Sequence, residues 1–125
     1  MEDILIKTIP HDKHRKEVGD TVGDWYNKDG THIVEVSKMS DRKYEALVII
    51  HELVEGILCT HAGISPELVD KFDKDWKEHD GLEEQGDDPK APYYRQHCMA
   101  LVIERLMAVE LGVDWNKYEK ELMSL

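Results

Sequence analysis

The sequence predicts an α+β domain in which short N-terminal antiparallel strands precede a buried central helix and two to three further helices. The strand-like segments all come first and the helix-like segments follow, so the chain lacks the alternation of repeated βαβ units. A long apolar segment in the middle supplies the core helix. Because 125 residues suffice for one core, we expect a single domain over residues 1–125.

Three segments have the composition of strands. The first is the isoleucine-rich segment Ile4–Ile9. The other two, Val22–Tyr26 and Thr31–Val36, flank the turn-forming residues Asn27–Gly30. This arrangement predicts an antiparallel hairpin. A polar segment, which includes His11 and His14, joins the first strand to the hairpin and is expected to be an exposed loop.

Capping residues set the expected helix boundaries. Serine and aspartate favour helix starts, proline suits the first helical position, and glycine favours helix ends. The first expected helix is Arg42–Thr60, after Ser40 and Asp41, and the second begins at Pro66 and includes Trp76. An acidic loop is expected over Asp80–Pro92. The last two expected helices are Tyr93–Leu111, which ends before Gly112, and a short helix from Asp114 to about Leu122.

Charge and cysteine content exclude several classes of protein. With 27 acidic and 16 basic residues the formal net charge is -11, which disfavours nucleic-acid binding through a basic patch. The apolar run Ala46–Ile50 is too short to span a membrane, and no signal-peptide pattern is present, so we expect a cytoplasmic protein. Cys59 and Cys98 lie in expected helices, without a CxxC pair, and are interpreted as reduced core thiols.

The strongest functional signal is a polar cluster inside the apolar segment Ala46–Cys59. Apart from Gly56, the only residues there that are not apolar are His51, Glu52 and Glu55. A helix that is apolar on nearly all sides is buried. Buried carboxylates must be paired, protonated or bound to a metal ion, so this cluster is costly unless it has a partner.

The spacing of the cluster suits a metal site. His51 and Glu55 are four residues apart and share one helix face, while Glu52 lies about 100° around the helix. Side chains with this spacing can hold a divalent metal ion, and the adjacent glutamate can act as general base on water. Zinc is the expected metal, with manganese or iron as alternatives.

The segment Tyr44–Leu58 resembles the active-site helix of zincin-type metallopeptidases, and Val34–Ser37 resembles the strand that precedes it. The chain also resembles a family of small phage- or prophage-type proteins, a resemblance that implies no particular activity. The segments that carry this second resemblance are Val22–Trp25, His51–Glu55, Gly86–Pro89 and Gly112–Trp115. Glu55 stands where zincins have a second histidine, which keeps a ligand but makes the site harder and less able to acidify water.

The third ligand has several candidates. His61 follows His51 by ten residues, as in the extended metzincin motif, but Leu58 stands where that motif has glycine. His97 and Glu104 are seven residues apart on one stripe of the last long helix. By resemblance to gluzincin-like sites, Glu104 would supply the third ligand. His97, Glu104 and His61 remain open alternatives.

The leading hypothesis is a metal-dependent hydrolase of amide or peptide bonds. In it His51, Glu55 and a residue of the last long helix hold the metal, and Glu52 is the catalytic base. The substrate or partner would be a protein or peptide. One alternative is a metal-free buried network in which Arg95 or Arg105 neutralises a carboxylate.

Two other functions stay open at this point. A non-enzymatic phage or prophage accessory protein would use its acidic surface to bind a basic protein partner. A magnesium-dependent nucleotide pyrophosphohydrolase would use carboxylates from several helices, although the strands and histidines argue against it. The oligomeric state is not predicted by the sequence.

Overall fold

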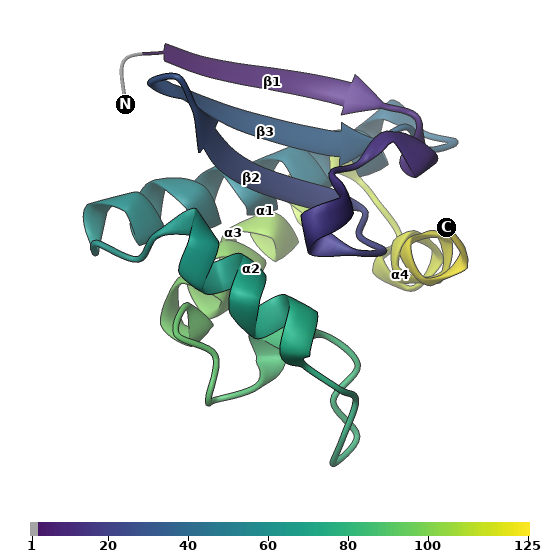
Figure 1. Ribbon diagram of the computed structural model, residues 1–125. Helices are drawn as coiled ribbons and strands as arrows, with labels where there is room; N and C mark the ends of the chain where they lie inside the picture. Colours follow the sequence, from purple (N-terminus) through teal and green to yellow (C-terminus); the bar gives the residue numbers. More distant parts are fainter. Residues whose placement is uncertain (1–2) are drawn as a thin grey trace.

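The computed structural model describes residues 3–125 and confirms the α+β fold. Three strands come first: β1 (Asp3–Ile9), β2 (Gly23–Lys28) and β3 (Thr31–Ser37). The α-helices are α1 (Arg42–His61), α2 (Pro66–Asp75), α3 (Tyr94–Leu111) and α4 (Trp115–Ser124), and short 3-10 turns cover His11–Lys13 (η1), Lys16–Val18 (η2) and Gln85–Asp87 (η3). The sheet lies over α1, and α3 lies on the other side of α1 (Figure 1).

The sheet is mixed, with the strand order β1-β3-β2. The predicted hairpin is present, since β2 pairs antiparallel to β3 with Trp25 opposite Val34. β1 differs from the antiparallel expectation because it pairs parallel to β3, with Leu5 opposite Ile33. The connection between Ile9 and Gly23 is long enough to pass from one side of β3 to the other, so β1 occupies the edge of β3 that the hairpin leaves free.

One face of β3 forms the main core with α1. Val34 and Val36 are fully buried there with Trp25 of β2 and Leu47 of α1. At about 25 cal/mol per Å² of apolar surface removed from water, this contact is a major source of the fold's stability. It holds α1 firmly between the sheet and α3.

The opposite face of β3 carries Ile33 followed by the polar Glu35 and Ser37, and the β1–β2 connection folds over this polar part. Tyr26 donates a hydrogen bond to Glu35, while His11 Nδ1 and His14 Nε2 lie 2.8 and 2.9 Å from Ser37 Oγ. Burial lowers the pKa of His14. The expectation of an exposed loop at His11 and His14 is therefore wrong, since both imidazoles cover a polar strand face that a single sequence pattern does not reveal.

The helix ends follow the capping signals of the sequence. The side chains of Asp41, Ser65 and Asp114 accept hydrogen bonds from backbone N–H groups at the starts of α1, α2 and α4. Gly112 ends α3 with a φ of 68°, in the left-handed region that glycine favours. The observed boundaries lie within two residues of those expected.

α1 is the central helix of the fold, packed by the sheet on one side and α3 on the other. Cys59 of α1 is buried and free, and burial raises the pKa of its thiol to about 12, as expected for a reduced core thiol. Cys98 of α3 is free and half-buried. In residues 3–125 no single helix is both long and apolar enough to cross a membrane, and α1 and α2 meet that test only jointly, across a bend of 119°.

Gly56 allows α1 to approach the sheet closely. A Cβ atom at this position would lie 2.6 Å from His32 Nε2 and 3.0 Å from Trp25 Cγ. His32 is fully buried, and its ring stacks on that of Trp25 at a centroid distance of 5.8 Å. Neither ring can move away without disturbing the core, so glycine is required here for space.

We expect Gly56→Ala to destabilise the protein by about 1–3 kcal/mol, because the added methyl group overpacks the core. In an open helix the same change stabilises by about 0.5–1 kcal/mol, so the sign is informative. Urea unfolding followed by circular dichroism measures the effect. Thr60→Ala, at an exposed position of α1, is the control and should stay within about 0.5 kcal/mol. A more stable Gly56→Ala variant would contradict the close approach.

Candidate metal centre

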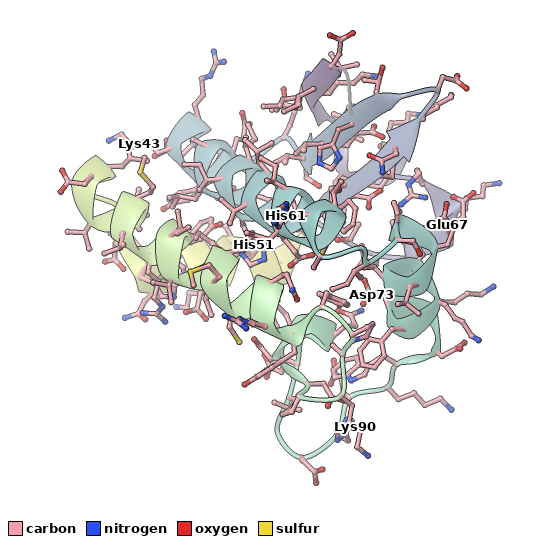
Figure 2. The ribbon with its side chains drawn as sticks, turned by 90° about the vertical axis from the view of Figure 1, so that its left-hand side faces the viewer. Lys43, His51, His61, Glu67, Asp73 and Lys90 are labelled. Atoms are coloured by element: carbon pink, nitrogen blue, oxygen red, sulfur yellow. The ribbon has the colours of Figure 1, made fainter. Side chains whose placement is uncertain are left out.

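The antiparallel contact of α1 and α3 brings four of the predicted site residues together. His51 and Glu55 come from α1, and His97 and Glu104 come from α3. Figure 2 shows His51 between α1 and α3. Their side chains are 11%, 7%, 5% and 6% exposed in that order, so all four polar groups lie inside the protein.

Three of these residues direct one donor atom each toward a common point. His51 Nε2 lies 3.2 Å from His97 Nδ1 and 3.3 Å from Glu55 Oε2, and His97 Nδ1 lies 3.0 Å from Glu55 Oε2. In a tetrahedral zinc site with bonds of roughly 2.0–2.1 Å, neighbouring ligand atoms are about 3.3 Å apart. The three residues therefore form a group that could hold a metal ion with little rearrangement.

Each of these side chains has a second nitrogen or oxygen atom that faces away from the common point, and a separate residue contacts that atom. Glu104 Oε1 lies 2.7 Å from His51 Nδ1, and Asp87 Oδ1 lies 3.1 Å from His97 Nε2. A carboxylate on the far nitrogen of a histidine is the usual support of a metal ligand, because it fixes the tautomer and the ring orientation. Both imidazoles have this support.

Glu55 is oriented in the same way. Trp25 Nε1 of β2 donates a 3.1 Å hydrogen bond to Glu55 Oε1, which leaves Oε2 directed toward the two imidazoles. Tyr118 of α4 donates a 2.6 Å hydrogen bond to Glu104 Oε2. Each supporting residue therefore comes from a different part of the fold, and the chain positions the three donor atoms from all sides.

The predicted residues do not all lie in equivalent places. Glu104 contacts the far nitrogen of His51 and stands behind the three convergent donors. His61 is exposed at the last residue of α1 and lies outside the group. Arg95 and Arg105 are also exposed, and Arg105 lies over the Trp115 ring at 4.4 Å. Within residues 3–125 neither arginine forms an ion pair with the buried carboxylates.

Sequence reasoning missed the residues that support the site from a distance. Asp87 belongs to the segment expected to be an acidic loop, yet η3 brings it into contact with His97. Gly86 makes this contact possible, since a Cβ there would lie 2.4 Å from His97 Cγ. The adjacent pair Gly86-Asp87 was the sequence feature that could have indicated this contact. No comparable sequence feature indicated that Trp25 and Tyr118 support the site, because buried aromatic residues are ordinary core residues.

The electrostatics of the group favour positive charge. Burial alone lowers the pKa of His51, but the adjacent carboxylates of Glu104 and Glu55 outweigh it and raise that pKa well above its usual range. The pKa of His97 is raised in the same way, mainly by Glu55. Burial would raise the pKa of Glu55, yet the two imidazoles lower it to about 2. A cation, whether proton or metal ion, is thus stabilised at this point.

Glu52 lies beside the group at the wall of a cleft with a volume of about 660 Å³. His51 and Glu104 line the same cleft. Burial, followed by the nearby Glu55 carboxylate, raises the pKa of Glu52 well above its usual value, and no hydrogen bond from the described residues opposes this. Gly23 makes room for the side chain, since a Cβ there would lie 2.7 Å from Glu52 Cγ.

A second group that could hold a metal ion consists of Glu84, Asp87 and His97. It shares His97 with the first group, but Glu84 is exposed and Asp87 is only half-buried. The side chains of the first group are only 5% to 11% exposed, and each of them is held by a second partner. We therefore identify His51, Glu55 and His97 as the candidate metal centre.

Comparisons of the chain with protein-family models, with curated proteins and with solved structures find no match. The resemblance of the α1 segment to zincin-type metallopeptidases stays a prediction. The function must therefore be argued from the geometry of the candidate metal centre and the cleft beside it.

We expect Tyr118→Phe to destabilise the protein by about 1–3 kcal/mol, because it leaves an oxygen of the buried Glu104 carboxylate without a donor. Tyr44→Phe is the matched control, since its ring packs 5.3 Å from that of Tyr118 but, among the described residues, its hydroxyl forms no hydrogen bond with Glu104. Chemical denaturation of both variants measures the difference. Equal stability of the two variants would show that the Tyr118 hydroxyl does not support the site.

Proposed function

We propose that this protein is a metal-dependent hydrolase that binds zinc through His51, Glu55 and His97 and cleaves amide or peptide bonds. The observation that carries the proposal is the convergence of three donor atoms whose side chains are each held by a second partner. Two histidines and one glutamate are a donor set found in catalytic zinc sites of metallopeptidases. The resemblance of Tyr44–Leu58 to the zincin helix supports the same interpretation.

Three protein ligands favour a catalytic site over a structural one, because structural zinc sites have four. A zinc ion held here would polarise a substrate carbonyl and lower the pKa of water. Glu52 lines the cleft, where it can accept a proton from water and donate it to the leaving nitrogen. Glu104 and Asp87 keep the two imidazoles oriented throughout, since each holds the ring nitrogen that faces away from the convergence point.

The cleft supports a substrate with basic side chains. Its polar lining is rich in carboxylates, contributed by Asp20, Glu52, Glu78, Glu83, Glu84, Asp87, Glu104 and Glu119, whereas Arg105 is the one lysine or arginine among the described lining residues. Trp115 and Leu122 add an apolar surface. Such a lining attracts lysine- or arginine-containing peptides and repels phosphate groups, which argues against the nucleotide pyrophosphohydrolase alternative.

We expect the purified protein to bind about one zinc ion per chain, and His51→Ala and His97→Ala to lose it. Elemental analysis and zinc titration measure this. Affinity should fall as the pH falls from about 8 to about 6, because protons compete for both imidazoles, whose pKa values are raised. Glu104→Gln should weaken binding by about 10–100-fold through the loss of support to His51.

His61→Ala is the matched control for the zinc measurement, because His61 belongs to the same helix but is exposed and outside the group. It should bind zinc like the wild type. If neither zinc, manganese nor iron binds to the wild type, the residues form a metal-free hydrogen-bond network. In that case the acidic surface would support the alternative function, that of a non-enzymatic protein that binds a basic partner.

We expect Glu52→Gln to retain zinc and lose about 10²–10⁴-fold in kcat, because an amide cannot accept the proton. The assay uses two short fluorogenic peptides of equal length, one with lysine and one with glutamate beside the cleavable bond. The lysine peptide should be the better substrate. Glu67→Gln, an exposed position on α2, is the control and should leave kcat unchanged (Figure 2). Full activity of Glu52→Gln would exclude Glu52 as the base.

A further inference from the structure

The outward face of α3 carries an unusual row of exposed apolar side chains. Met99, Val102, Leu106 and Val109 are 48%, 55%, 63% and 77% exposed. In Figure 2 α3 lies beside α1 at the left of the view, while the sheet and α2 lie on the other side of α1. Single exposed apolar residues are normal on protein surfaces, but a continuous row along a whole helix marks an interaction site.

The spacing of this row is that of a coiled-coil seam. Its members follow one another at intervals of three, four and three residues, and exposed Arg95 precedes Met99 by four. Alternating intervals of three and four give the 3.5-residue period that lets two helices pack along their length. The buried residues His97, Ala100, Glu104 and Ala108 lie on the opposite side of the helix, toward α1. α3 therefore has two separate packing faces.

We propose that the exposed row of α3 binds a second copy of this chain through an antiparallel contact between the two α3 helices. The charges at the helix ends support a second copy as the occupant. Arg95 is the second residue of α3 and Glu110 is the second from its end. Both are exposed, and neither forms an ion pair within residues 3–125.

A two-fold axis through the middle of α3 would bring these features into register. It places Arg95 beside Glu110 of the partner subunit at both ends of the contact. The same axis places Met99 beside Leu106 of the partner subunit, with Val102 near the centre. A parallel arrangement would instead put like charges together at each end, which is unfavourable.

The size of the contact determines its strength. An 18-residue helix is about 27 Å long, and one helix pair buries less than the roughly 1,200–2,000 Å² of a stable interface. The net charge of -11 on each copy adds repulsion. We therefore expect a reversible dimer with a Kd in the micromolar range. This interface does not depend on the proposed hydrolase function, since it lies on the opposite side of α3 from His97 and Glu104.

Sedimentation equilibrium on the full chain, from about 1 to about 300 μM, tests the proposal. The average mass should rise with concentration from 14.5 kDa toward twice that value. Leu106→Glu should weaken dimerisation by about tenfold or more, because it places a charge in the seam. Leu68→Glu is the matched control, since Leu68 is 46% exposed on α2 and outside the row.

A charge exchange tests the antiparallel register. Arg95→Glu and Glu110→Arg alone should each weaken the dimer, and the double variant should recover the wild-type Kd within about threefold. Circular dichroism confirms that each variant is folded. A wild type that is monomeric throughout, a dimer indifferent to Leu106→Glu, or a double variant weaker than both single variants would each overturn the proposal.

Discussion

Two imidazoles and two carboxylates lie where α1 and α3 pack together, a place that most proteins fill with apolar side chains. Charges buried in this way are tolerated only when each polar atom has a partner. Here β2 supplies Trp25, η3 supplies Asp87 and α4 supplies Tyr118. The sheet, the long loop and the last helix are thus each tied to the same buried polar group.

Close packing around this group depends on glycine at three positions. Gly23 leaves room for Glu52, Gly56 lets α1 reach the rings of the sheet, and Gly86 lets the loop contact the His97 ring. A side chain at any of them would displace the polar residue that now occupies this space, which is Glu52, His32 or His97. The geometry of the site therefore depends on the space at these three glycines as well as on the ligand atoms.

The two faces of α3 separate two tasks. Its inner face gives His97 and Glu104 to the candidate metal centre, and its outer face carries the apolar row that we assign to a second copy of the chain. None of the four residues of the row lines the cleft, whereas Glu104 of the inner face does.

The sequence alone determined the fold class, the helix boundaries and the polar cluster of α1. Asp41, Ser65 and Gly112 act locally, so their effects can be read without the tertiary structure. The cluster at His51–Glu55 was visible because charge inside an apolar helix requires a partner. Only the tertiary structure decided the parallel pairing of β1, the place of Glu104 behind His51 and the return of Asp87 to His97. These depend on how distant segments cross one another, and helix periodicity indicates which face points inward but not which residue it meets there.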